Sequence, residues 1–221
     1  MKNTKERIVL AAERLFAVRG ISGVSLRRIT TKANVNLAAI NYHFGSKQGL
    51  ILHIVEKRLG AVNRERLHRL DFLEKEGRIP SVPEIVDAFL APALEFVATA
   101  EGKNFVGMMG RLHLEAPPEL RKRIYRELHK VLTRFIEVFS KALPHHSRQA
   151  VLGRISFMVG AMAHTLIGSE NLGALARQLS IPFGRDFLLK DLARFVSAGF
   201  EAEAEDVNLK APLSQKQGSD A

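Results

Sequence analysis

Apolar residues recur every three or four positions along almost the whole chain, and turn-forming residues interrupt this pattern at short intervals. Such spacing is typical of amphipathic helices, and no stretch shows the strict alternation that is typical of a strand. Breaks such as RGISGV (19–24) and EGRIPSVP (76–83) separate the helical segments. The sequence therefore predicts an all-α protein of about nine helices, because the breakers divide it into that many segments.

The positive charge of the chain is confined to its first third. Residues 1–70 contain 14 Lys and Arg against 4 Asp and Glu, whereas residues 71–221 contain 19 of each. A basic part joined to a neutral part suggests that the first meets a polyanion and the second has another task. The alternative is a basic surface that only keeps the protein soluble.

Two features bear on the location of the protein. The N-terminus has charges within its first two turns, so we expect no signal peptide. The longest uncharged run, 155–169, contains Ser156, His164 and Thr165, and it is short for a membrane span. We therefore expect a buried helix there and a cytoplasmic protein. The absence of cysteine excludes disulfides, thiol nucleophiles and cysteine-based zinc modules.

Two short predicted helices lie next to each other in the basic part. Ser25 is a suitable cap for a helix over 26–33, and Asn36 for a second over 37–44. Two helices separated by three residues match the geometry of a helix-turn-helix, whose second helix enters the major groove. Its inward positions would be Ile40 and Phe44, which leaves small and polar residues facing outward.

The outward residues of this unit are candidates for DNA contact. Leu37 and Ala38 permit close approach to base edges, and Asn41 can bond adenine. Tyr42, His43 and Lys47 can reach phosphate oxygens, which position the domain without reading sequence. The predicted DNA-binding residues are Ser25, Arg27, Arg28, Asn36, Leu37, Ala38, Asn41, Tyr42, His43 and Lys47.

The segment VSLRRITTKANVNLAAINYHFGSKQGL (24–50) resembles the DNA-binding domain of TetR-family transcriptional regulators. The resemblance covers about residues 4–52. It implies that the segment 42–44 and Lys47 hold the DNA backbone while the outward residues of 37–41 face bases. Asn34 stands where the family usually has a glycine, but asparagine tolerates the left-handed conformation. Asn41 stands where the family often has an aromatic residue, so the base preference is open.

The resemblance also implies how the chain is divided. We predict a helix-turn-helix domain at 1–48, a ligand-binding and dimerisation domain at 49–205, and a disordered tail at 206–221. In TetR-like proteins the last two long helices form a four-helix bundle with a partner, and the segments 147–168 and 185–205 carry apolar stripes that fit this role. Two-fold symmetry would then direct the dimer to palindromic DNA. The alternative is that the stripes face the core of a single chain.

For a ligand pocket, the segment KNFVGMMGRLHL (103–114) is the most suggestive, because methionine is adaptable and two glycines lighten the helix. Arg111 could hold a carboxylate. The predicted lining residues are Phe89, Phe96, Phe105, Met108, Met109, Arg111, Leu112, His113, Phe135 and His164. The alternative is that these apolar residues are ordinary core.

The second half also resembles, more loosely, the C-terminal domain of PsrA-like regulators, through the segments APPELRKRIYRE (116–127) and ISFMVGAMAHTL (155–166). That resemblance implies an effector of fatty-acid type, with an elongated apolar body and an acidic head. We expect a homodimeric transcriptional repressor that leaves a palindromic operator when a small apolar or acyl-type molecule binds.

The sequence gives little support for an enzyme. The sequence lacks a glycine-rich phosphate loop, a GxSxG elbow and an HExxH pair, and the pair His145 and His146 lacks the spacing of two ligands on one helix face. We expect no enzyme activity, no cofactor and no metal. The alternative function is a ligand-independent adaptor, bound to DNA, whose neutral domain binds a protein partner.

Overall fold

The computed structural model describes residues 3–203, except for the side chains of residues 113, 114, 168–171 and 185. Within this range the chain is helical and contains no strand, so the predicted all-α class is confirmed. The N-terminal helices are α1 (Thr4–Arg19), α2 (Leu26–Ala33), α3 (Leu37–Phe44) and α4 (Lys47–Leu73). The remaining elements are the 3-10 turn η1 (Lys75–Gly77) and α5 (Val82–Ala98), α6 (Ala100–Glu115), α7 (Pro118–Ala142), α8 (Arg148–Gln178) and α9 (Arg185–Glu201). The predicted tail at 206–221 lies outside the described residues.

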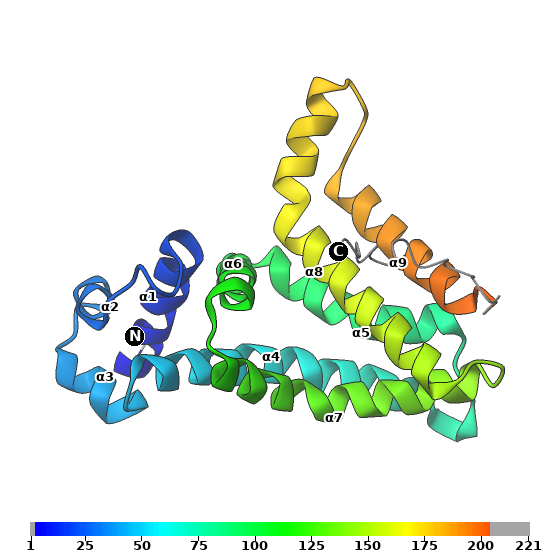
Figure 1. Cartoon of the computed structure of the whole chain (residues 1–221), viewed down its shortest axis with the longest axis horizontal. Coiled ribbons are helices and arrows are strands. Elements are labelled where there is room, and N and C mark those ends of the chain that lie inside the picture. The colour runs from blue at the N-terminus through cyan, green and yellow to red at the C-terminus, as the bar shows by residue number, and fades with distance from the viewer. Residues whose placement is uncertain (1–2, 204–221) are drawn as a thin grey trace, which may run out of the picture.

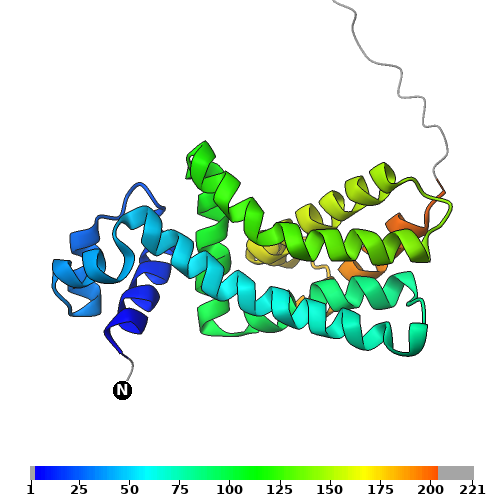
Figure 2. The ribbon, with the colours of Figure 1, turned by 90° about the horizontal axis from the view of Figure 1, so that it is seen from below.

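The helices form an elongated molecule with two unequal parts (Figure 1). The first three helices make one end, and α4 leads from them along the larger part, with α7 beside it. The pair α8 and α9 rises from the other helices. Seen from below, α6 stands between the three-helix end and the rest of the molecule (Figure 2).

Side-chain caps fix the starts of the helices around the turn. In each case the side-chain oxygen accepts a hydrogen bond from a backbone N–H three residues further on, over 2.9 to 3.3 Å. The capping residues are Asn3, Ser25, Asn36 and Ser46. Asn34 ends α2 with φ of 50°, so this asparagine does adopt the left-handed conformation expected at the turn. Such caps contribute about 1 kcal/mol each.

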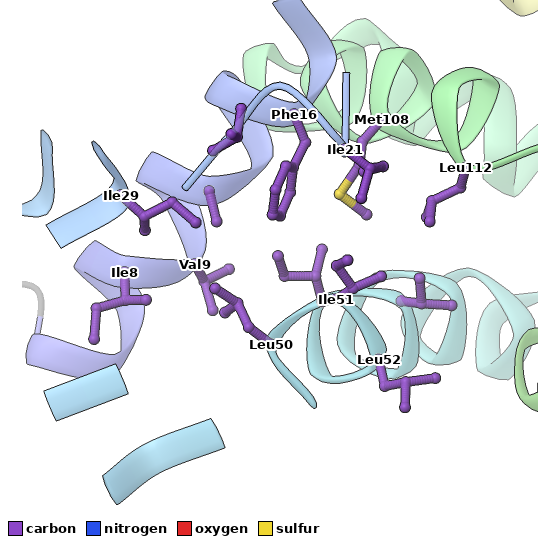
Figure 3. Packing of buried hydrophobic residues seen from close by; sticks show 14 of the residues in the cluster. Ile8, Val9, Phe16, Ile21, Ile29, Leu50, Ile51, Leu52, Met108 and Leu112 are labelled. Carbon is purple, nitrogen blue, oxygen red and sulfur yellow. The ribbon is translucent and has the colours of Figure 1, made fainter. Parts of the chain in front are cut away.

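The first hydrophobic core joins the three-helix end to α4 and α6. Phe16 of α1 and Met108 of α6 point toward each other, and Leu50 and Ile51 of α4 close the same space (Figure 3). All four side chains are buried. The core therefore continues across the predicted domain boundary at residue 48.

The second core lies between α4, α5, α7, α8 and α9. Phe89 and Phe135 meet edge to face with ring centroids 5.0 Å apart, and Phe139 stacks on Phe200 at 4.0 Å. Aromatic pairs of this kind contribute about 1 kcal/mol beyond the area they bury. This core holds together α5, α7, the N-terminal half of α8 and the C-terminal half of α9.

Helix α8 differs from the prediction in length and burial. It extends to Gln178, past the predicted end near residue 168. Its stretch Arg148–Ile167 has a mean hydropathy of 1.5, which is long and apolar enough to cross a membrane by length and composition, yet only 17% of it is buried in the chain. The expectation of a buried helix is therefore wrong, because much of this apolar stretch faces outward.

Candidate DNA-binding surface and effector pocket

Helix α3 presents the predicted residues on its outer face. Ile40 is fully buried, which fixes the rotation of the helix, while Ala38 and Asn41 are exposed and Leu37 is 39% exposed. The three outward residues lie on the first turn and a half of α3. A helix with such a face can approach base edges closely.

The end of α3 carries aromatic groups next to this face. Tyr42 is 86% exposed, and its ring meets that of His43 edge-on with centroids 5.0 Å apart. The ring of Phe44 is half-buried and lies 5.3 Å from His53 of α4. The phenol of Tyr42 is therefore held on a supported ring and is free to donate to a phosphate oxygen.

The two arginines of α2 and the two capping residues are also at the surface. Arg27 and Arg28 are exposed. Ser25 and Asn36 use their side-chain oxygens to accept backbone N–H groups of their own helices. Both residues are exposed and keep donor hydrogens, which a phosphate oxygen could accept.

Lys47 makes contacts inside the chain, and its predicted contact with a phosphate stays a prediction. Its ammonium donates a short hydrogen bond to the carbonyl of Ile21 and lies 5.9 Å from the ring centroid of Phe16. Burial lowers the pKa of Lys47, and the charge of Glu115 opposes this effect. The ammonium has three donor hydrogens, so a phosphate could share it with Ile21, but its partial burial makes it a weaker candidate than the exposed arginines.

A further basic residue shapes the turn and was missed by the sequence reasoning. Arg7 of α1 donates to the carbonyl oxygens of Ala33 and Asn34, each over 2.7 Å. These bonds fix the turn between α2 and α3 against α1. Charge-assisted bonds to backbone carbonyls are strong, so the spacing of the two short helices is set from outside them. No sequence pattern marked Arg7 for this role.

The predicted effector residues do not come together around a cavity. Phe105, Met108 and Leu112 belong to the first core, whereas Phe89 and Phe135 belong to the second. Phe96 and Met109 are half-buried against the first core, Arg111 and His164 are exposed, and the side chain of His113 lies outside the described residues. None of the described members lines either of the two pockets below, because the apolar face of α6 is occupied by packing against α1.

A different pocket, of about 400 Å³, lies between α5, α6, α8 and α9. Seven of its eleven lining residues are aliphatic or aromatic, and Lys103 also lines it. The lining residues are Val97, Lys103, Val106, Gly107, Thr165, Leu166, Ile167, Gly173, Phe183, Leu188 and Leu189. We call this the α8 pocket. A second hollow of about 550 Å³ lies between the distal half of α4 and α5, beside Phe72 and Asp87.

Helix α6 has one side on the α8 pocket and the other on α1. Gly107 is so close to α1 that an added Cβ would meet the Cβ of Ala17 at 3.1 Å. Gly110 approaches α8, where an added Cβ would meet Ile167 at 3.2 Å. The two glycines thus allow α6 to be packed tightly between the three-helix end and the pocket.

The apolar stripes predicted for the dimer interface are partly buried within the chain itself. Val151, Ile155 and Met158 of α8 and Leu192 and Val196 of α9 are buried in the chain's own core, as the alternative reading expected. Other apolar side chains on these two helices are exposed, with Phe157 at 76% and Phe195 at 71%, and of these Phe187 and Phe195 belong to the predicted stripe of the segment 185–205. The larger members are Leu152, Phe157, Leu172, Leu175, Phe187 and Phe195, which we call the α8–α9 face.

Comparison with known proteins agrees with this arrangement. The family "Bacterial regulatory proteins, tetR family" matches residues 8–54, and "Tetracyclin repressor-like, C-terminal domain" matches residues 87–199. The chain is 27% identical to the regulator AcrR of Shigella flexneri over 184 residues, covering 77% of this chain and 81% of that protein. It is 28% identical to the repressor NicS of Pseudomonas putida over 102 residues, which span 46% of this chain and about half, 48%, of NicS.

Solved structures show the same fold at low identity. The fatty acid degradation regulator FadR of Bacillus halodurans aligns with a TM-score of 0.66 at 14% identity, over 90% of this chain and 97% of that one. FadR of Bacillus subtilis, crystallised with stearoyl-CoA, aligns with a TM-score of 0.64 at 13% identity, over 87% and 97%. Two matched domains, an exposed reading helix and the shared fold lead to one conclusion: this chain belongs to the TetR family of DNA-binding transcriptional regulators, which are not enzymes.

Proposed function

We propose that this protein is a cytoplasmic, homodimeric repressor that occupies a palindromic operator and leaves it when an apolar or acyl-type effector binds. The observation that carries the proposal is the outer face of α3, where Leu37, Ala38 and Asn41 are exposed beside the 86% exposed Tyr42. The arginines of α2 add positive charge beside this face. Phosphate contacts would position the domain and the face of α3 would read bases.

The α8–α9 face supports the dimer. Phe157 and Phe195 are large, apolar and mostly exposed, and an apolar face on a helix pair is normally covered by another element. A second copy, related by a two-fold axis, would place the same face against itself and make a four-helix bundle. Two copies of α3 would then address two half-sites of a palindrome, about one turn of DNA apart.

The α8 pocket supports an effector with a large apolar part. Its volume of about 400 Å³ falls in the usual range for small-molecule sites, and its lining is mostly aliphatic and aromatic. A fold neighbour, FadR of Bacillus subtilis, was crystallised with stearoyl-CoA. The likeness in fold and the lining together favour a long-chain acyl compound.

Helix α6 offers a route from the pocket to the DNA. Val106 and Gly107 line the pocket, while Met108 lies in the first core against Phe16 of α1. A ligand that fits only one position of α6 would therefore favour one position of α1 and of the turn it fixes. The effector must bind the released state more tightly than the DNA-bound state, because only differential affinity shifts the equilibrium.

The test is selection from a random duplex pool, with wild type and two variants of the chain's only tyrosines. Tyr42→Ala should lose the enriched palindrome, whereas Tyr125→Ala, exposed on α7, should keep it. Binding of all three proteins without any enriched sequence would overturn the proposal and favour the adaptor function. If an operator is enriched but no acyl compound releases the protein from it, the DNA-binding function stands and the effector part of the proposal fails.

A further inference from the structure

The second core contains a charged residue with no charged partner. Arg66 of α4 is 2% exposed, and no carboxylate of the described residues lies within ion-pair distance of its guanidinium. Its Nε donates to the carbonyl of Phe89 over 2.8 Å, and Nη1 donates to Oδ1 of Asn63 over 3.0 Å. Nη2 lies 3.6 Å from the sulfur of Met162. The guanidinium sits over the Phe89 ring, 3.8 Å from its centroid.

This arrangement leaves the charge poorly compensated. A guanidinium has five N–H donors, and here only two of them meet oxygen while a third meets a thioether, which is a weak acceptor. Burial lowers the pKa of Arg66 to about 9, so the side chain is still cationic at neutral pH. A buried cation whose partners are neutral dipoles and a ring is an expensive group to keep for packing alone. An anion placed beside it would gain a strong, charge-assisted contact.

Helices α5 and α8 connect the residues around this cation with the α8 pocket. Leu166, which lines the pocket, follows Met162 by one turn of α8, and Val97 follows Phe89 by two turns of α5. These separations correspond to about 6 Å and about 12 Å along the helices. Met162 contacts the guanidinium and lies one turn before Leu166, and methionine changes rotamer readily.

We propose that Arg66 is the receptor for a carboxylate at the end of the effector, whose apolar remainder fills the α8 pocket. This inference rests on the proposed effector function. The carboxylate takes the place of the Met162 sulfur and accepts two parallel hydrogen bonds from the guanidinium. The ligand class is therefore a long, apolar, free carboxylic acid, since the nucleotide of a coenzyme A thioester is too large to enter the packed interior at Arg66.

Calorimetry with decanoate, decanol and decanoyl-CoA on the full-length protein tests the assignment. Wild type should bind decanoate, and the uncharged decanol should bind about ten- to hundred-fold more weakly, as expected for loss of hydrogen bonds to a charged group. Arg66→Met should reduce decanoate affinity by a similar factor and leave decanol unchanged. Arg64→Met, which makes the same change at an exposed position of α4, should behave as wild type.

Stability separates a receptor from a structural residue. Replacing an uncompensated buried cation by an apolar side chain of similar length should leave the melting temperature unchanged or raised. If Arg66→Met does not fold, Met162→Phe tests the same idea from the other side, because a stiff ring beside the guanidinium should block decanoate while DNA binding persists. Arg66→Lys should retain part of the affinity for decanoate.

Four results would overturn the inference: equal binding of decanoate by wild type and Arg66→Met, equal binding of decanol and decanoate by wild type, loss of decanoate binding only in Lys103→Met, or no binding of decanoate at all. The proposed function fails by a different result, namely the absence of an enriched operator. A protein that binds its operator and is released by decanoyl-CoA or decanol, but not by decanoate, would keep the function and exclude the receptor role of Arg66.

Discussion

The guanidinium of Arg58 donates two hydrogen bonds, of 2.7 and 3.0 Å, to the carboxylate of Glu13 inside the contact between α4 and α1. Glu13 is fully buried, and the same guanidinium reaches Glu101 of α6 over 2.7 Å. Burial raises the pKa of Glu13 more than the bonds and charge of Arg58 lower it. One cation thus connects α4 with α1 and α6.

Removal of the buried carboxylate should be costly. We expect Glu13→Ala to lower the free energy of unfolding by about 3 kcal/mol or more, because Arg58 is left buried with only Glu101 as a charged partner. Urea unfolding measures the loss. Glu6→Ala is the matched control, since it also removes a link from α1 to α4, with Lys57, but at the surface, where such pairs contribute less than about 1 kcal/mol. Equal losses would show that the buried pair has no special role.

The cap of α5 gives a dependence on pH. Glu84 accepts hydrogen bonds from Arg78 and from the backbone and hydroxyl of Ser81, which lower its pKa to about 2. A carboxyl whose pKa falls on folding stabilises the native state above its unfolded value of 4.5, and this contribution disappears as the pH falls from 4.5 toward 2. The NMR chemical shift of the Glu84 carboxyl carbon should titrate with a midpoint near pH 2, and Arg78→Ala should raise that midpoint. An unchanged midpoint in the variant would contradict the assigned cause.

The salt dependence of DNA binding should separate the arginines from Lys47. Each cation that contacts a phosphate contributes about 0.9 to the slope of log K against log salt. Arg28→Met should therefore flatten the slope by about 0.9, whereas Lys47→Met should leave the slope almost unchanged, because its ammonium is bound to Ile21. Arg123→Met, exposed on α7, serves as control. A flatter slope in Lys47→Met would mean that this lysine turns outward on DNA.

The exposed aromatic residues should hold the dimer together. Phe157→Arg and Phe195→Arg place a charge on the α8–α9 face, where burying it against a second copy would be unfavourable. Sedimentation at micromolar concentration should give a dimer for wild type and monomers for both variants. Phe72→Arg, at an exposed position of α4, should remain dimeric. Dimers in all four proteins would place the interface elsewhere.

Tight packing of α6 against α1 can be tested at its glycine. Gly107→Val should lower stability by about 1 to 3 kcal/mol through overpacking, since the added Cβ alone would meet Ala17 at 3.1 Å. Gly60→Val has the same cost of helix propensity, but an added Cβ there meets only the end of the Arg64 side chain, at 3.6 Å. Thermal unfolding of both variants should separate the two. Equal melting temperatures would mean that α1 adjusts without loss.

The DNA-reading end could be predicted from the sequence in detail because its signals are local. Ser25 and Asn36 mark the starts of α2 and α3, and the spacing from Asn36 places Ile40 inside and Asn41 outside. Caps and periodicity act within a few residues, so they survive whatever the rest of the chain does.

The effector region could not be predicted in the same way. Periodicity indicated that Met108 is buried but not that its neighbour is α1, because a stripe defines a face and not its partner. The exposure of Phe157 was hidden for the same reason. A signal for Arg66 did exist, since it continues the inward register of Val62 and Leu70 on α4, but register alone does not show what a buried charge contacts.

The tight contact between α6 and α1 has a consequence for protein engineering. A simple chimera of two such regulators would join the DNA-binding domain of one to the C-terminal domain of the other, with the junction just before α4. In this protein such a cut would leave Met108 and Gly107 facing a foreign surface where Phe16 and Ala17 now stand. A functional chimera would have to carry the matching face of α6 with the head, so the transferable unit is discontinuous in sequence.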